Sequence, residues 1–445
     1  MEVIAPPARR VLERLERAGY EAYLVGGCVR DLLLDRRPGD WDITTAARPE
    51  EVLSLFAPQA AATGLKHGTV TVFEGAASFE VTTFRLDGTY ADHRHPGAVT
   101  FSDSLAEDLK RRDFTVNAMA MDQAGEITDL FGGREDLARG VLRCVGRPEQ
   151  RLEEDALRIM RALRFSSVLG FTLAPETADA VFQGKSLLRE VAVERVREEL
   201  LKLLCGRCVV PALLQYAEVL GVVLPEILPA VGCDQRNIHH CYDVWEHIAR
   251  TVRFVPPNAV LRMTMLLHDL GKPGTMTVDE DGTGHFRGHA DVSCTLGKTI
   301  LERLRFDKES TRRILTLVQW HDVPIEQTQK AMRRLLHKLG EQGVRDLLQV
   351  KRADNLAQAS AYHGRQGQID TLEALLQQAL EQDACFTLRQ LAVNGRDLLE
   401  QGYRGREVGA ALQFMLDAVI DGTLPNEKQA LLKVLSTEFA SNATE

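Results

Sequence analysis

Cysteine is scarce in this chain, and long apolar runs are missing. Eight cysteines are scattered over 445 residues, too few for a disulfide framework. No stretch approaches the roughly 18 uncharged apolar residues that a membrane-spanning helix needs. The first residues, Met1 to Pro7, lack the basic start and apolar core of a secretory signal. We therefore expect a cytoplasmic protein with no membrane partner.

Basic residues are in a minority. Lys and Arg number 54 against 63 Asp and Glu, so the net charge is −9. This balance argues against non-specific coating of nucleic acid, although a local basic path on one face remains compatible with it. Hydrophobic residues at 44% and charged residues at 26% form the ordinary globular mixture, which excludes a disordered or fibrous protein. The length predicts roughly two to four domains.

The pattern of secondary structure changes along the chain. Within the first 140 residues, helical segments alternate with runs of β-branched and aromatic residues, which predict strands at 23–25, 41–44, 69–73 and 79–84. From residue 149 onward nearly every periodic segment has helical spacing, and Pro or Gly marks the breaks. The sequence thus predicts a multidomain protein, with an α+β head followed by an all-α body.

Two carboxylates stand close together in the second predicted strand. Asp40 and Asp42 are two residues apart, and on a strand such side chains point to the same face. A carboxylate pair at a strand edge suits Mg²⁺, which takes few protein ligands and completes its shell with phosphate oxygens and water. A solvated strand end is the alternative interpretation of this pair taken alone.

A Gly-Gly turn lies upstream of the carboxylate pair. Gly26 and Gly27 follow a predicted strand and open a helix, with Arg30 in its first turn. Glycines let a phosphate approach the backbone, and helix amides together with an arginine hold it. Such a turn followed by two carboxylates describes a site for a triphosphate and its metal ions, as nucleotidyl transfer by two metal ions requires.

Four ordered motifs give the chain a family resemblance. They comprise residues 26–31 with 40–42, residues 111–120, residues 129–133 and residues 154–165. Together they resemble the signature of the class II tRNA nucleotidyltransferase and bacterial poly(A) polymerase family, in the DNA polymerase beta-like superfamily. The resemblance implies a head with a mixed sheet, Mg²⁺ at the Asp pair, and tRNA, CTP and ATP as partners.

The second motif supplies further candidates for the nucleotide site. Arg111 and Arg112 are candidates for neutralising a phosphate chain, and Asn117 for a hydrogen bond to ribose or phosphate. The resemblance adds Asp113 to the same nucleotide-binding set.

A third carboxylate and a polar loop complete the predicted head. Glu80, on the predicted strand 79–84, is a candidate catalytic carboxylate if that strand pairs beside the one with the Asp pair. An ordinary surface glutamate is the alternative. The polar stretch 87–96 has too many turn residues for regular structure. It resembles the flexible loop of family members that add the whole CCA sequence, which favours complete addition.

The fourth motif predicts a pair that reads the incoming base. Asp155 and Arg158 are three residues apart in a helix predicted from about residue 154, so they share a face. An intrahelical salt bridge worth roughly a few tenths of a kcal/mol is the alternative. The resemblance matches both residues, with Arg161 nearby, to base-reading positions. There the carboxylate accepts from an amino group and the guanidinium donates.

Histidines gather in the helical body. Seven of the twelve lie between positions 239 and 321. With a later aspartate they match the H…HD…D pattern of the HD phosphohydrolase superfamily, which implies one or two transition-metal ions at His247, His268, Asp269, His289, His321 and Asp354. A bridging carboxylate such as Asp269 suits phosphoester hydrolysis by two metal ions. Ordinary helix histidines, or a degenerate site, are the alternatives.

These observations predict four parts. They are a catalytic head (1–140), a helical neck for nucleotide selection and RNA binding (141–225), an HD-type metal-binding domain (226–365) and a helical tail that binds tRNA (366–445). The leading hypothesis is template-independent addition of CCA to tRNA 3′ ends by a monomer or homodimer. Partial addition of CC or A, or poly(A) synthesis, is the second hypothesis. A metal phosphohydrolase with an RNA-binding head is the third.

Overall fold

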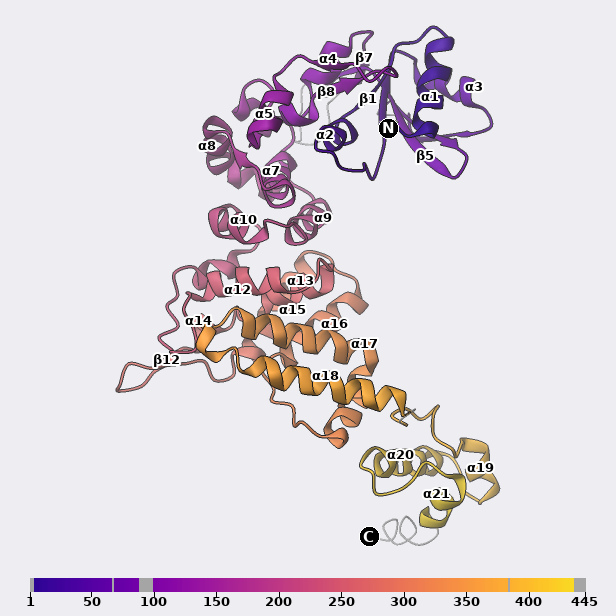
Figure 1. The fold of residues 1–445 in the computed structure, drawn as a ribbon, viewed down its shortest axis with the longest axis vertical. Coiled ribbons are helices and arrows are strands. Elements are labelled where there is room, and N and C mark those ends of the chain that lie inside the picture. Colours follow the sequence, from indigo (N-terminus) through magenta and orange to yellow (C-terminus); the bar gives the residue numbers. More distant parts are fainter. Residues whose placement is uncertain (1–3, 66–67, 88–98, 383–384, 436–445) are drawn as a thin grey trace. The chain divides into compact units, whose positions relative to one another are not determined.

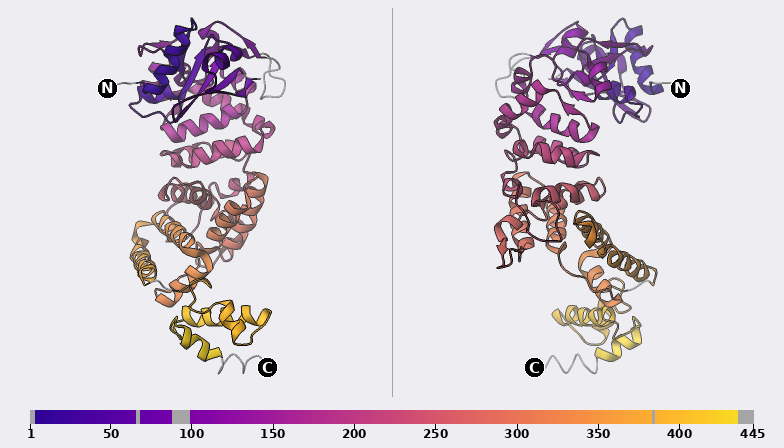
Figure 2. Two further views of the ribbon diagram at one scale, coloured as in Figure 1. Left: turned by 90° about the vertical axis from the view of Figure 1, so that its right-hand side faces the viewer. Right: turned by 60° about the vertical axis from the view of Figure 1, so that its left-hand side comes forward.

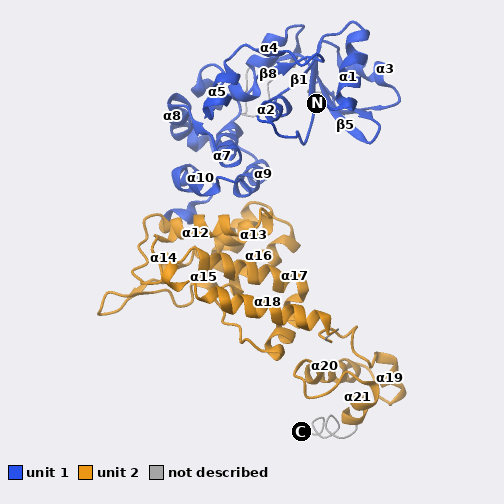
Figure 3. Ribbon diagram, viewed as in Figure 1, with its two compact units in different colours: residues 1–228 blue, residues 229–445 orange. Residues whose placement is uncertain are grey.

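The structure, a computed structural model, describes residues 4–65, 68–87, 99–382 and 385–435. The chain divides into two units, residues 1–228 and 229–445 (Figure 3). This division lies close to the boundary expected at residue 225, while the finer four-part division remains a prediction. The polar loop expected at 87–96 lies outside the described residues from position 88 onward. No helix in the described ranges is long and apolar enough to cross a membrane.

A seven-stranded mixed sheet forms the head of unit 1 (Figure 1). Its order is β3-β4-β5-β2-β1-β8-β9, and β2 pairs with β5 in parallel while the other neighbours are antiparallel. The strands are β1 Ala22–Val25, β2 Asp42–Thr45, β3 Ala60–Gly64, β4 Thr69–Glu74, β5 Ala77–Thr83, β8 Met119–Met121 and β9 Ile127–Asp129. A separate two-stranded ladder joins β6 Arg85–Asp87 and β7 Val99–Phe101.

Side chains that are alternately buried and exposed explain why these segments of the head form strands. In β4, Val70 and Val72 are buried while Phe73 is exposed, as expected for a strand with one face on the core. The helices of the head are α1 Pro6–Arg17, α2 Gly27–Leu33, α3 Pro49–Phe56 and α4 Leu105–Lys110, of which α1 and α3 pack on the sheet. The strands predicted at 23–25, 41–44, 69–73 and 79–84 are confirmed within about a residue or two at each end.

Helices follow the sheet within unit 1 (Figures 1 and 2). They are α5 Gly133–Arg139, α6 Pro148–Glu154, α7 Leu157–Leu169, α8 Pro175–Gly184, α9 Val193–Leu204, α10 Val209–Gln215 and α11 Ala217–Leu220. A short parallel pair, β10 Val141–Leu142 and β11 Thr172–Leu173, interrupts them. Helix α7 packs against α6, α9 and α10 and is buried over most of its surface, which makes it the core of this region.

Unit 2 is helical except for one hairpin, β12 Thr277–Val278 with β13 Gly284–His285, among the residues described. Its first helices are α12 Val244–Phe254, α13 Ala259–Leu267, α14 Lys272–Thr275, α15 His289–Arg303, α16 Lys308–Trp320, α17 Gln329–Leu356 and α18 Arg365–Glu381. Helices α17 and α18 lie side by side (Figure 1). The last helices, α19 Gly395–Glu400, α20 Arg406–Ile420 and α21 Lys428–Val434, surround a core of their own that includes Leu398, Met415 and Leu431.

Candidate functional site

Two of the three predicted catalytic carboxylates lie where β2 and β5 meet. Asp42 is the first residue of β2 and stands opposite Glu80 of β5 in the parallel register. The expected pairing of these two strands is therefore confirmed. The expectation that Asp40 and Asp42 share a strand face is wrong, because Asp40 lies in an exposed bend before β2 begins. The turn at Gly39 keeps Asp40 out of the sheet.

The electrostatics of these carboxylates fit a divalent cation. Burial is the main factor that raises the pKa of Asp42. Arg112 counteracts burial, and the negative charges of Glu80 and Asp40 raise this pKa further. A cation placed among the three carboxylates relieves both the burial and the mutual repulsion. Carboxylate oxygens are the ligands that Mg²⁺ takes in proteins, although these three carboxylates are not among the groups of converging ligand atoms in the described residues.

Gly26 holds open the space beside these carboxylates. Its φ of +75° lies in the left-handed region, and a Cβ there would lie 3.0 Å from Arg112 Nη1 and 3.8 Å from Asp42 Oδ2. A side chain at this position would therefore have a strained backbone and would lie tight against the Arg112 guanidinium. The predicted turn between β1 and α2 is confirmed. Gly26 is required there by its left-handed backbone conformation and by the close approach of the Arg112 guanidinium.

Arg111 and Arg112 share a buried carboxylate that the sequence analysis missed. Arg111 donates from Nε and Nη2 to Asp108 Oδ1 at 2.9 and 2.7 Å, and Arg112 Nη2 lies 3.2 Å from Asp108 Oδ2. Burial acts to raise the pKa of Asp108, but the two guanidiniums outweigh it and lower that pKa. The spacing of three and four residues before the arginines is the signal that could have revealed Asp108.

Four of the predicted nucleotide-binding residues bind one another. Arg161 Nε donates to Asp113 Oδ2 at 2.7 Å, and Asn117 Nδ2 donates to Asp113 Oδ1 at 3.1 Å. Arg30 Nη1 in turn donates to Asn117 Oδ1 at 2.7 Å. Burial acts to raise the pKa of Asp113, but Arg161 and Asn117 outweigh it, so the pKa lies well below its usual range. This network joins α2 to α7.

Asp155 and Arg158 do not share a helix face, so that expectation is wrong. Asp155 has extended backbone between α6 and α7, where its Oδ1 accepts a hydrogen bond from the backbone N–H of Leu157 at 3.1 Å. Arg158 pairs with Glu154 and Asp155 pairs with Arg195, at 2.6 and 2.9 Å. The alternative, a salt bridge between Asp155 and Arg158, is therefore also wrong. The helix predicted from about residue 154 is interrupted at Asp155, because α6 ends at Glu154 and α7 begins at Leu157.

A cavity of about 980 Å³ brings most of the predicted site residues together. Of the predicted site residues in the first 165 positions, all but Glu80 line it: Gly26, Gly27, Arg30, Asp40, Asp42, Arg111, Arg112, Asp113, Asn117, Asp155, Arg158 and Arg161. Residues that the sequence analysis missed also line it, among them Arg164, Phe165, Arg195 and Lys202. The Phe165 ring lies 5.2, 5.4 and 4.1 Å from the guanidiniums of Arg30, Arg161 and Arg164. The lining of the cavity is predominantly basic, because its arginines and lysine outnumber its aspartates.

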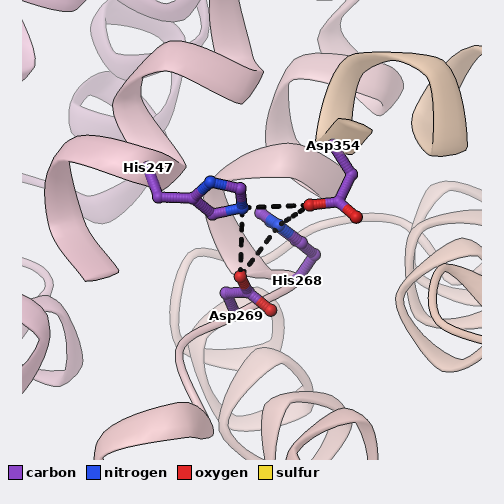
Figure 4. Close-up of side chains that lie close together, drawn as sticks. All are labelled: His247, His268, Asp269 and Asp354. Atoms are coloured by element: carbon purple, nitrogen blue, oxygen red, sulfur yellow. Dashed lines mark hydrogen bonds and ion pairs between the residues drawn. The ribbon is translucent and has the colours of Figure 1, made fainter. Parts of the chain in front are cut away.

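In unit 2 the six predicted metal ligands lie together. His247, His268, Asp269 and Asp354 form one group of converging ligand atoms (Figure 4). Asp269, His289 and His321 form a second group, with all ligand atoms of each group within 4.8 Å of one another. Asp269 belongs to both groups through its two carboxylate oxygens. The predicted clustering is confirmed, and Asp269 has the position of a bridging ligand.

Backbone carbonyls orient three of these imidazoles. The Nδ1 atoms of His268, His289 and His321 lie 2.7, 2.8 and 2.6 Å from the carbonyl oxygens of Met265, Phe286 and Val318. A carbonyl only accepts, so each Nδ1 carries a proton and a neutral ring leaves its Nε2 lone pair available. Nε2 of His268 is buried and has no hydrogen-bond partner of normal geometry among the described residues. This is the arrangement that a metal ligand requires.

Carboxylates give the cluster its negative charge. Burial acts to raise the pKa of Asp354, but hydrogen bonds from His247 and His268 outweigh it, so this pKa lies well below its usual range. Burial acts to lower the pKa of His268, but the negative charge of Asp269, with a smaller contribution from Asp354, raises it to about 10. A proton and a metal ion therefore compete for His268 Nε2. Nitrogen and carboxylate ligands together fit a transition metal.

Three family models match separate parts of the chain. Residues 22–143 match the poly A polymerase head domain, residues 170–230 the probable RNA- and SrmB-binding site of polymerase A, and residues 289–435 the putative second domain of tRNA nucleotidyltransferase. The mixed sheet, its carboxylates and the basic cavity agree with the first of these. The head therefore defines the class: a nucleotidyltransferase with a poly(A) polymerase-type head.

Similar proteins extend this assignment to the whole chain. The CCA-adding enzyme of Levilactobacillus brevis is 37% identical over 437 residues, 96% of this chain and 97% of its own. A crystal structure of the Bacillus stearothermophilus CCA-adding enzyme in complex with CTP has 34% identity and a TM-score of 0.76, and the match covers 99% of this chain and 100% of that one. The chain belongs to the family of CCA-adding enzymes.

Some relatives match a shorter part of the chain at higher identity. The CCA-adding enzyme of Lactobacillus helveticus is 56% identical over 199 residues, which are 45% of this chain. In that match the chain spans 50% of the length of the relative.

Proposed function

We propose that the chain adds CCA to the 3′ ends of tRNA without a nucleic-acid template, using CTP and ATP. The observation that carries this proposal is the 37% identity to a CCA-adding enzyme over 96% of the chain, since it extends from the head through the C-terminal helices. The cavity supports it as well, because it combines carboxylates for metal ions with arginines for a triphosphate.

The head residues divide the work of nucleotidyl transfer. Asp40, Asp42 and Glu80 would hold Mg²⁺, which when bound activates the 3′ hydroxyl of tRNA and neutralises the departing pyrophosphate. Arg111 and Arg112 bind the triphosphate, and their shared carboxylate keeps both guanidiniums turned toward the cavity.

The base is selected by protein side chains. Asp155 accepts from an exocyclic amino group and Arg158 donates to a ring nitrogen. Cytosine and adenine share this donor and acceptor pattern, whereas uracil and guanine present others. The same pair of side chains thus serves for both bases of the CCA sequence.

Sequencing of reaction products tests the proposal. A tRNA that lacks the terminal trinucleotide is incubated with CTP and ATP, and its 3′ ends are sequenced. We expect ends in CCA. Ends in CC or a single added A would show partial addition, and a long A tail would show poly(A) synthesis; either result overturns complete addition.

The cluster of unit 2 supports a second function, phosphoester hydrolysis. Six ligands with Asp269 shared between two groups suit one or two transition-metal ions, which when bound supply a hydroxide nucleophile and polarise a phosphoryl group. The substrate would be a terminal 2′,3′-cyclic phosphate or 3′ phosphate on RNA, since nucleotide addition needs a free 3′ hydroxyl. Incubation of such RNA ends with the metal-loaded protein tests this, and absence of hydrolysis with every transition metal contradicts it.

Location and assembly complete the proposal. A cytoplasmic monomer or homodimer is what we expect for this enzyme. Size-exclusion chromatography with light scattering distinguishes the two assemblies.

A further inference from the structure

Arg195 of α9 holds the carboxylate proposed to read the base. Its Nη2 donates to Asp155 Oδ2 at 2.9 Å and its Nη1 to Asp155 Oδ1 at 3.3 Å. Oδ1 also accepts from the backbone N–H of Leu157 at 3.1 Å. A two-pronged pair of this kind fixes the plane of a carboxylate as well as its position. Both side chains are mostly shielded, with exposed fractions of 28% and 18%.

The second base-reading group is held by other elements. Arg158 Nη1 donates to Glu154 Oε2 at 2.6 Å and to the carbonyl of Arg151 at 2.7 Å, and Nη2 donates to the carbonyl of Arg111 at 3.0 Å. None of these contacts involves α9. The orientation of the two reading groups relative to each other therefore depends on Arg195, whose side chain joins Asp155 to α9.

Asp155 has other cations within electrostatic range. Its charge contributes to the raised pKa of Arg161, which lines the same cavity. Asp155 also lies in extended backbone at a helix junction, where its carbonyl accepts a hydrogen bond from the backbone N–H of Arg158 at 2.9 Å. Without Arg195, the Asp155 carboxylate keeps the single hydrogen bond from the backbone N–H of Leu157, so its plane can rotate toward Arg161 and away from the orientation that a base amino group needs.

The packing of α9 supports a rigid arrangement. Arg195, Glu199 and Lys202 follow one another at spacings of four and three residues, so they share a face of α9. Glu199 pairs with Arg164 of α7 at 3.1 Å, and both side chains are largely buried. The Glu199–Arg164 ion pair thus ties the face of α9 that carries Arg195 to α7. It restricts movement of α9, and therefore of Arg195, relative to the start of α7.

We propose that Arg195 is a positioning residue for base selection, acting through Asp155. This proposal rests on the proposed function, in which Asp155 accepts from the amino group of cytosine or adenine. Arg195 keeps the carboxylate in the orientation that distinguishes an amino donor from the carbonyl acceptor of uracil. Arg195 acts through Asp155 and need not touch the reacting atoms.

Steady-state kinetics of the full chain test this role. Arg195→Ala, Arg195→Lys and the control Arg197→Ala, on the same helix but outside the cavity lining, are compared with CTP and UTP on tRNA lacking CCA. We expect Arg195→Ala to lower the ratio of kcat/KM for CTP over UTP by roughly tenfold. Arg195→Lys keeps the charge but not the fork, so it restores the ratio in part. The control keeps the ratio of the unaltered chain.

A double-mutant cycle separates the two proposals. If Arg195 acts through Asp155, the double variant Asp155→Asn with Arg195→Ala has the same ratio of kcat/KM for CTP over UTP as the single variant Asp155→Asn. Additive losses overturn the positioning role, as does an unchanged ratio in Arg195→Ala. An unchanged ratio in Asp155→Asn alone instead overturns base reading by Asp155, and with it the premise. If Arg195→Ala does not fold, Arg195→Lys decides, since an unaltered ratio there contradicts the need for a two-pronged contact.

Discussion

Replacing Asp113 by Asn tests whether the network between α2 and α7 holds the head together. The carboxylate accepts hydrogen bonds from Arg161 and Asn117, and only 7% of Asp113 is exposed. An amide in its place has one acceptor oxygen and presents donors to the donors already there. Asp113→Asn therefore leaves the guanidinium of Arg161 without its counter-ion.

The magnitude follows from burial. Breaking a buried ion pair costs roughly 3–5 kcal/mol, but 32% of the Arg161 side chain stays exposed to the cavity, so we expect about 2–4 kcal/mol. For a unit of this size the midpoint falls by roughly 2–4 °C per kcal/mol, which predicts a loss of roughly 4–16 °C. The control Asp103→Asn breaks a pair with Arg48 of 2.8 Å whose carboxylate is 80% exposed, and it should leave the midpoint nearly unchanged.

Calorimetry of the full chain measures both variants, and hydrogen exchange of peptides from residues 105–165 assigns the transition to unit 1. The pKa of Asp113 is lower in the folded chain than its ordinary value of 3.8, so its stabilisation is present above that value and is lost as the pH falls below it. The difference between Asp113→Asn and the unaltered chain should therefore narrow below about pH 4. Equal losses in Asp113→Asn and Asp103→Asn would refute the reasoning from burial.

The remaining predictions concern the chemistry of the two sites. Asp42→Ala should abolish nucleotide incorporation while tRNA binding, measured by filter retention, persists; near-normal incorporation would contradict metal binding at this residue. Glu80→Gln should lower kcat without a comparable change in the KM for CTP, and an unchanged kcat would return Glu80 to an ordinary strand residue. Asp155→Ala should incorporate UTP or GTP more readily, with a loss of roughly 1–3 kcal/mol of discrimination against them in competition assays. Unchanged selectivity would make Asp155 a structural partner only. The double variant His268→Ala with Asp269→Ala should lose the roughly one to two equivalents of transition metal and the phosphoesterase activity but keep CCA addition. Equal metal content in both proteins would contradict that assignment.

Local pattern was enough for the elements of the head sheet. Valines and aromatic residues that alternate between two faces predict β4 and β5, and the structure has strands at both places. The same reasoning failed at Asp40, because a bend at Gly39 delays the strand until Asp42. It failed again at Asp155, since helical spacing on both sides conceals the break between α6 and α7.

The sequence by itself determined the family resemblance and the set of candidate ligands, because motif residues and their order can be read without coordinates. The clustering of His247 with Asp354, 107 residues apart, was expected on that basis and is present. Only the tertiary structure decided that Asp155 forms an ion pair with Arg195, 40 residues away. It also decided which residue of β5 lies opposite Asp42, namely Glu80. The physical reason is that an ion pair or a strand register depends on how distant elements pack, and periodicity describes each element alone.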